Sequence, residues 1–429
     1  MKNVFNHILP ILILTGFLSC KKPFTAHLAT ITTNFLAIDG PIISGDSTFI
    51  TLSRTTSLSD TTQNKAELKA MVAVEDDQAK LYPLSEKGKG KYVLGVTNFS
   101  TVHKYRLDIK TTDGKIYQSD FVPMKVTPPI DSVYFKQNSD ATVLFYVNAH
   151  DANNGTRYYR WDYKETWSYV PLYQSYYQYK NGQIVPIAPD SPDAINICYR
   201  TDLSNQVFIG SSAKLAEDVI SNQQLGGLLN VSEKLGHVYV MQLKQYALTE
   251  DGFNYYQNLK TNTEQLGSIF DAQPSLLKGN IHCITSPNDI VIGFISASTV
   301  ANKQLNVHHN DLPLRGPDPY GGIDWIPNHA YSSYYFPAPD TGACHFSEIS
   351  TFPYPTFASR FAKIFSIPGY TLIDRVPAIE TDVPGPSFLQ PDEPAAIGYT
   401  YYYALKNCVD CRTKGGTNIR PAYFPLPAY

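Results

Sequence analysis

Apolar and polar residues alternate with a period of two along the first third of the chain. The clearest case is Lys104 to Lys110, KYRLDIK, where charged residues alternate with Tyr, Leu and Ile. This pattern predicts a strand with one face in a core and the other in water. The dipeptide Asp113-Gly114 follows as a typical hairpin turn, and Ile116-Tyr117 begins the return strand.

Similar short runs recur throughout this region. They amount to roughly seven strands in about 100 residues, the spacing of an immunoglobulin-like sandwich. We therefore predict such a β domain over residues 38–127. Tyr105, at the start of a late strand, is typical of the tyrosine corner of these sandwiches.

A second module follows Pro128-Pro129, which predicts a stiff linker. Alternation resumes around Phe145 and Trp161, and Thr249-Glu250-Asp251 predicts a helix start because Thr caps well and acids favour the first turn. We expect residues 128–429 to form a larger β-sandwich-like domain. It would carry Tyr-rich and helical insertions and a Cys-containing C-terminal region, so the whole chain is predicted to be mainly β.

The first twenty residues have the pattern of an export signal. Lys2 is positive, Ile8 to Leu18 is largely apolar, and Ser19 precedes Cys20. The apolar run is shorter than the roughly 18 residues of a membrane-spanning helix, so it fits a signal peptide. Phe17-Leu18-Ser19-Cys20 resembles a bacterial lipobox. We predict a lipoprotein signal peptide at residues 1–19, then a lipid anchor at Cys20 and a tether over residues 20–37, which would hold the protein on a membrane.

Charge and motif content narrow the function. The 429 residues include 35 Lys+Arg and 38 Asp+Glu, for a net charge of −3. Without an excess of basic residues, nucleic-acid binding is not expected. The sequence contains no H-E-x-x-H, G-x-S-x-G or G-x-x-x-x-G-K-[ST] motif. We therefore predict no catalytic residue, no metal site and no cofactor.

The cysteines suggest a disulfide. Lipidation of Cys20 leaves 6 − 1 = 5 of the six cysteines, which cannot all pair. Export favours disulfides, and Cys408 and Cys411 are the candidates for a structural one, with pairing left open. Two alternatives remain. One is a redox pair, although no flanking helix is predicted. The other is a zinc site completed by His282-Cys283 or Cys344-His345.

Aromatic residues gather just after the strand that contains Trp161. Tyr and Trp combine a flat apolar face with a polar tip, which suits a sugar ring or a protein partner. We predict a ligand- or partner-binding surface here; the alternative is that the rings fill a core. The candidate residues are Trp167, Tyr169, Tyr173, Tyr176, Tyr177 and Tyr179.

Several motifs spread over the chain resemble one known family. They are YYRWDY (158–163), CYRT (198–201), KQYALT (244–249), NTEQLGSIFD (262–271), KGNIHC (278–283) and CVDCR (408–412). The series is similar to the Bacteroidetes lipoproteins classed as domain of unknown function 4249. The resemblance implies an envelope protein, often encoded near TonB-dependent outer-membrane receptors. It implies no established reaction, cofactor or catalytic residue.

Together these features predict a lipid-anchored protein of the cell outer membrane. We expect a non-enzymatic binding or accessory subunit, associated with an outer-membrane receptor or transporter. Two alternatives stay open: a glycan- or peptide-acting envelope enzyme whose active site comes from distant segments, and a surface adhesion or structural protein.

Overall fold

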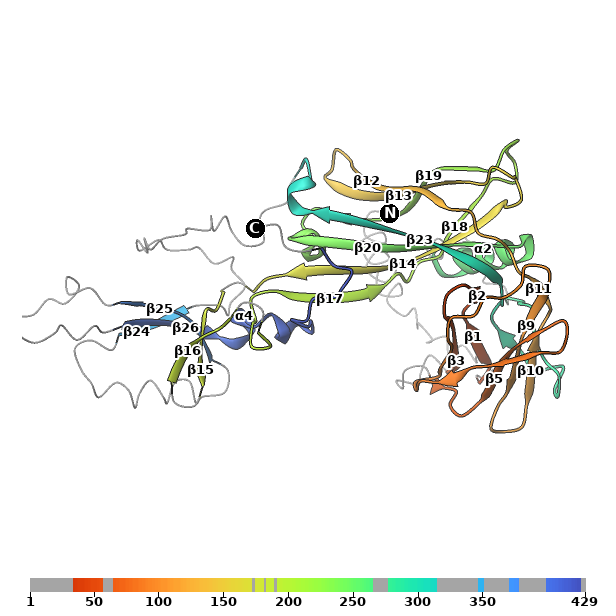
Figure 1. Ribbon diagram of the computed structural model, residues 1–429, viewed down its shortest axis with the longest axis horizontal. Coiled ribbons are helices and arrows are strands. Elements are labelled where there is room, and N and C mark those ends of the chain that lie inside the picture. Colours follow the sequence, from red (N-terminus) through yellow and green to blue (C-terminus); the bar gives the residue numbers. More distant parts are fainter. Residues whose placement is uncertain are drawn as a thin grey trace, which may run out of the picture.

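The computed structural model describes residues 34–56, 65–171, 174–180, 183–188, 191–264, 277–314, 346–350, 370–377 and 399–425. Within these ranges the chain is mainly β, as predicted from the sequence. Two β-sandwiches lie next to each other, and helix α2 (Glu250–Glu264) is beside them (Figure 1). Smaller sheets lie toward the other end of the long second sandwich (Figure 1).

The N-terminal sandwich consists of two six-stranded sheets that face each other across one core. The strands of the first sheet are β22 (Val291–Ile292), β1 (Leu36–Asp39), β3 (Thr48–Arg54), β8 (Lys91–Leu94) and β7 (Ser85–Glu86), with β4 (Lys65–Ala66) beside β3. The strands of the second are β21 (Ile281–Cys283), β10 (Ile116–Ser119), β9 (Lys104–Lys110), β5 (Met71–Asp76) and β6 (Leu81–Pro83), with β11 (Val122–Pro123) beside β9.

The alternating run at Lys104–Lys110 is strand β9, and its Tyr, Leu and Ile side chains are buried. Tyr105 donates a hydrogen bond of 3.0 Å from its hydroxyl to the carbonyl of Ser100. This is the bond of a tyrosine corner, which returns to the backbone a few residues upstream. The prediction of an N-terminal immunoglobulin-like sandwich is confirmed at this level.

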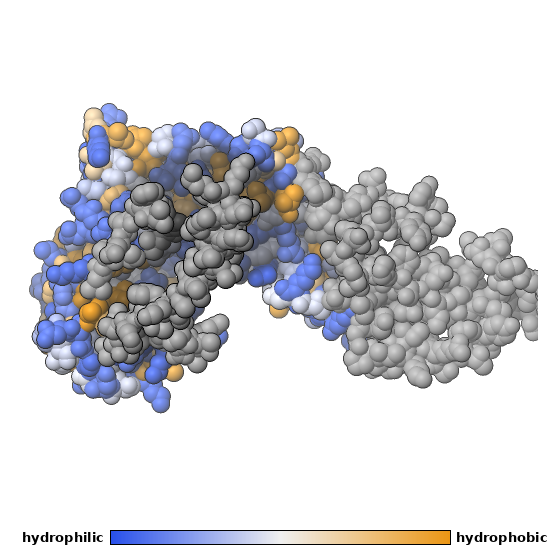
Figure 2. Space-filling model, turned by 180° about the vertical axis from the view of Figure 1, so that it is seen from behind, coloured by the Kyte–Doolittle hydropathy of each residue, from blue (hydrophilic) through white to orange (hydrophobic). Residues whose placement is uncertain are grey.

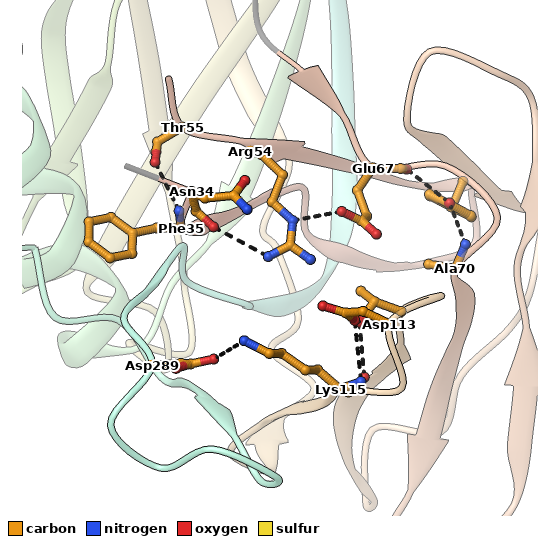
Figure 3. A network of polar contacts seen from close by, with 11 residues as sticks. Asn34, Phe35, Arg54, Thr55, Glu67, Ala70, Asp113, Lys115 and Asp289 are labelled. Atoms are coloured by element: carbon orange, nitrogen blue, oxygen red, sulfur yellow. Dashed lines mark hydrogen bonds and ion pairs between the residues drawn. The ribbon is translucent and has the colours of Figure 1, made fainter. Parts of the chain in front are cut away.

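The boundary predicted at residue 127 does not separate the two sandwiches completely, because segments after it belong to the N-terminal sandwich. Strands β21 and β22 belong to the later part of the chain, yet both complete the N-terminal sandwich: Tyr117 pairs with Cys283, and β1 runs parallel to β22. The ion pair between Lys115 Nζ and Asp289 Oδ2, 2.5 Å long, joins the same two parts of the chain (Figure 3).

Polar contacts also fix the start of the described chain to this sandwich. The Arg54 guanidinium donates to the Glu67 carboxylate at 2.6 Å and to the carbonyl of Asn34 at 3.4 Å (Figure 3). Both charged side chains are largely shielded from water, at 10% and 13% exposure. A shielded pair of this kind is screened less by salt than a surface pair.

The second sandwich packs a three-stranded sheet on a six-stranded one. The small sheet has β12 (Ile130–Gln137), β13 (Thr142–His150) and β19 (Val219–Leu229). The large sheet has β17 (Cys198–Leu203), β14 (Tyr158–Tyr169), β20 (Val238–Ala247), β23 (Ala297–His308) and β2 (Ile42–Ser44), with β18 (Phe208–Ser211) beside β14. Its core is rich in aromatic rings, among them Phe145, which stacks on Tyr239 at 5.3 Å.

The two sandwiches are joined by more than a linker. Strand β2, close to the N-terminus, pairs in parallel with β23 of the large sheet. Nearby, Thr127 N donates to Thr299 Oγ1 at 2.8 Å, and Lys244 Nζ lies 2.8 Å from Asp46 Oδ2. The chain therefore passes from one sandwich to the other several times.

The remaining described elements are short. They comprise the hairpin β15 (Tyr177–Lys180) and β16 (Gln183–Pro186), the sheet β24 (Phe346–Ser350), β26 (Tyr399–Leu405) and β25 (Tyr370–Pro377), helix α4 (Lys406–Val409), and the 3-10 turns η2 (Glu233–Leu235), η3 (His309–Asp311) and η5 (Cys411–Lys414). The chain after η5 returns to the large sheet, where Tyr199 and Thr417 exchange backbone hydrogen bonds of 2.7 and 3.0 Å.

Candidate functional site

A pocket of about 400 Å³ lies where the N-terminal sandwich meets helix α2. Four stretches of chain line it: the turn from β10 into β11, the first half of α2 with the preceding Thr249, the residues just before β21, and Phe294 after β22. Its volume is within the roughly 300–1,000 Å³ typical of small-molecule sites. We name it the junction pocket and take it as the candidate functional site.

Helix α2 provides a polar wall. Thr249 caps the helix as predicted, since its Oγ1 accepts a hydrogen bond from Gly252 N at 3.2 Å. Asp251, Asn254 and Asn258 are exposed and line the pocket. Because they are spaced i, i+3 and i+7, they fall on one face of the helix.

The base of the pocket is apolar and closely packed. Tyr255 stacks on Phe294 with ring centroids 5.4 Å apart, and both are buried. Burial raises the pKa of Tyr255 to about 12, so its hydroxyl stays protonated at neutral pH. Gly252 lets the helix approach this base, because an added Cβ there would lie 3.1 Å from the Phe294 ring.

Two glycines allow the backbone to form the wall that precedes β21. An added Cβ at Gly279 would lie 1.6 Å from the carbonyl oxygen of Gly293, so only glycine fits. Next to it, Asn280 is buried, and its amide both donates to and accepts from the backbone of Ile295, at 2.9 and 2.8 Å. These contacts fix the wall firmly.

Charged groups of both signs stand at the pocket. Asp120 Oδ1 lies 3.2 Å from His282 Nε2, while Lys278 and Asp251 are exposed lining residues. Phe121 adds an apolar wall that is 37% exposed. The Arg106 guanidinium sits 4.6 Å from the centroid of the Phe121 ring and restrains it.

Arg160 fastens α2 to the large sheet. This buried side chain lies 4.9 Å from the ring centroid of Tyr246 and 4.7 Å from that of Tyr256. It also donates hydrogen bonds to the hydroxyl of Tyr256 and, at 2.9 Å, to Asp162. Burial opposes its charge, but Tyr256 and Asp162 outweigh this and raise the pKa of Arg160. The helical wall of the pocket is therefore held in position from the side of the second sandwich.

Two of the six aromatic residues predicted as a binding surface lie in the core instead. Trp167 and Tyr169 are 2% and 1% exposed. They lie on β14, a strand paired on both sides, and alternate side chains of this strand, these two among them, point into the core. The prediction of a binding role is wrong for these two. Tyr169 instead donates its hydroxyl proton to the carbonyl of Cys411 at 2.8 Å.

Only two of the other predicted aromatic residues have described side chains, and these differ in exposure. Tyr176 is 44% exposed, and Tyr177 is half-buried at the start of β15. Tyr173, and the side chain of Tyr179, lie outside the described residues. No described member of the tract lines the junction pocket.

The predicted disulfide exists, but with a different pairing from a local Cys408–Cys411 bridge. Cys411 is bonded to Cys198, 213 positions earlier in the sequence. This excludes Cys411 as a thiolate ligand for zinc or as half of a C-x-x-C redox pair. Cys283 is free and buried. The side chain of Cys408, and the whole of Cys344, lie outside the described residues.

In the described ranges, no group of three or more His, Cys, Asp and Glu side chains is arranged to hold a metal ion. Within the same ranges no helix is long and apolar enough to cross a membrane. Cys20 and the signal-like segment lie outside the described residues. The surface seen from behind carries its apolar residues in small groups among hydrophilic ones (Figure 2).

Fold and pocket together define a class of protein: a two-sandwich β protein with a polar pocket beside the junction. A more specific assignment comes from family comparison. Residues 21–304 match the family described as a domain of unknown function (DUF4249), and the chain belongs to this family. No curated protein matches the chain. The matched region includes every residue of the junction pocket.

Proposed function

We propose that this protein is a lipid-anchored binding or accessory subunit of the cell envelope that serves a TonB-dependent receptor of the outer membrane. The observation that carries the binding role is the junction pocket, whose polar wall on α2 is held by Arg160 and whose opposite wall is rigid backbone. A pocket already shaped in this way can bind a ligand without the cost of ordering its walls.

The sequence supports the proposed location in the envelope. Phe17-Leu18-Ser19-Cys20 supports cleavage before Cys20 and acylation of that residue. Several acyl chains anchor a protein stably, whereas one chain does so only marginally. The family resemblance motivates the receptor as partner.

The test is an affinity purification of the tagged protein from native membranes solubilised in mild detergent. We expect a β-barrel receptor to copurify with the parent protein. The matched variant is Cys20→Ala, which should leave the membrane fraction or retain its signal segment. Recovery of the parent without any β-barrel partner would refute the accessory role, and unchanged membrane fractionation of Cys20→Ala would refute the anchor.

A second candidate, an enzyme acting on glycans or peptides, is favoured by one observation. Asp120 and Asp251 come from different elements, yet both line the junction pocket. Two carboxylates at one site are the usual equipment of glycoside hydrolysis. Turnover of an oligosaccharide or peptide that is abolished in both Asp120→Asn and Asp251→Asn would establish this function in place of simple binding.

A further inference from the structure

The junction pocket has a lining that selects among ligand chemistries. Helix α2 contributes three planar polar side chains on one face: the carboxylate of Asp251 and the amides of Asn254 and Asn258. A carboxylate accepts hydrogen bonds only, whereas an amide side chain both accepts and donates. A ligand that satisfies this wall must therefore offer donors and acceptors side by side along its length.

The charge of the lining disfavours anionic ligands. Asp120 and Asp251 would repel a phosphate or another polyanion, with Lys278 as the one cationic side chain among the described lining residues. His282 already engages the Asp120 carboxylate, and Lys278 offsets part of the remaining negative charge of the lining. A ligand without net charge meets no such penalty.

Shape and apolar surface complete the description. Phe121 presents an exposed ring that Arg106 restrains, and Phe294 and Tyr255 form an apolar base. A sugar ring has hydroxyl groups around its edge, each a donor and an acceptor, and C–H groups on its faces. Such a ring can turn its hydroxyls to the helix and a C–H face to the aromatic wall.

We propose that the junction pocket binds the end of a neutral oligosaccharide. This inference rests on the proposed binding function and gives it a ligand class. Asp251, Asn254 and Asn258 hydrogen-bond the sugar hydroxyls, and Phe121 packs against the ring. The pocket volume of about 400 Å³ admits a short saccharide and leaves the rest of the chain outside.

The experiment uses the mature full-length protein and an array of immobilised neutral, sulfated and uronic-acid oligosaccharides, with a panel of short peptides on the same surface. The test variant is the double substitution Asn254→Ala and Asn258→Ala. Both positions are exposed on α2, where alanine favours the helix. The matched control is Gln257→Ala, an exposed residue of the same helix that does not line the pocket.

We expect the parent and Gln257→Ala to bind neutral oligosaccharides equally. The double variant should lose at least about tenfold in affinity, because it lacks the two amides that are proposed to hydrogen-bond the sugar hydroxyls. The proposal is overturned if no neutral oligosaccharide binds, if only acidic glycans or peptides bind, or if the double variant binds as the parent does. Copurification of a receptor from membranes is measured separately. Failure to bind oligosaccharides would therefore leave the accessory role intact, and failure to copurify a receptor would leave oligosaccharide binding intact.

Discussion

The Cys198–Cys411 bond gives the most quantitative prediction. Cys198 opens β17, Cys411 opens η5, and both are buried. The bond holds the last described segment against the large sheet, where Phe424 meets Tyr199 edge-on with ring centroids 4.9 Å apart. Replacing both cysteines with alanine removes the covalent closure but leaves these contacts.

The magnitude follows from the length of chain that the bond closes. For a separation of 213 residues, the chain-entropy relation gives about 5 kcal/mol at room temperature. Removal of native disulfides typically costs about 2–5 kcal/mol, so the calculated figure is an upper value. We therefore expect Cys198→Ala/Cys411→Ala to lose about 3–5 kcal/mol of unfolding free energy.

The assay is guanidinium denaturation of the oxidised protein followed by tryptophan fluorescence, since Trp161 and Trp167 are both buried in this sandwich. Limited proteolysis locates the loosened part, which should be the segment after residue 405. The control is Cys283→Ala, which removes a buried free thiol and no covalent bond. A double variant that unfolds at the same denaturant concentration as the parent would refute the assignment of this bond as a main constraint.

Three other predictions follow from single positions. Gly293→Ala should destabilise the N-terminal sandwich by about 3 kcal/mol or more, because φ is +142° and the added Cβ would lie 2.2 Å from a backbone oxygen of β1; the melting temperature reports this. Arg160→Met should cost about 1–3 kcal/mol and raise the hydrogen-exchange rate of α2, because the guanidinium no longer bonds Tyr256. Burial, with help from two neighbouring histidines, lowers the pKa of His237 below its usual 6.5. As the pH drops, His237 is protonated in the unfolded chain before it is in the folded protein, so the free energy of unfolding falls below about pH 6.5. In denaturation measured across pH, His237→Gln should make this fall smaller.

Each of these three has a matched control or a contrary outcome. Gly88 also has a positive φ, +83°, but open space around it, so Gly88→Ala should cost far less than Gly293→Ala. Equal losses would contradict the clash argument. Unchanged exchange of α2 in Arg160→Met would mean that the helix is fixed by packing alone. An identical pH dependence in His237→Gln would assign the acid sensitivity to other groups.

Local pattern was enough for parts of this fold. Strand β9 and the Thr249 cap were predictable because each depends only on residues close by in the sequence. The burial of Trp167 and Tyr169 was also within reach of the sequence. Both are an even number of residues from Trp161 on the same strand, so their side chains point to the same face as Trp161. Continuing the alternation along the strand would have predicted that they are buried with it.

The junction pocket was beyond such reasoning. Its lining comes from residues near 120, 250, 280 and 294, which are brought together by tertiary pairing such as that of β21 with β10. The bond from Cys411 to Cys198 has the same origin, since β17 and η5 meet through tertiary packing. One local signal did exist: Asp251, Asn254 and Asn258 form a polar stripe at helical spacing on a helix whose start was predicted.

The return of β21 and β22 to the N-terminal sandwich bears on the order in which the protein can fold. The first part of this sandwich ends at Pro123, and Ile292 comes 169 residues later. At about 5–20 residues per second, that segment takes roughly 10–30 s to synthesise. Until it arrives, β1 and β10 each have an edge without its final neighbour.

An incomplete sheet of this kind is slow to become stable and open to wrong pairing. The delay keeps the early strands from closing into a compact domain while the rest of the chain is still being made. The same interlacing means that the two sandwiches should be acquired in one cooperative event near the end of synthesis, and not one after the other.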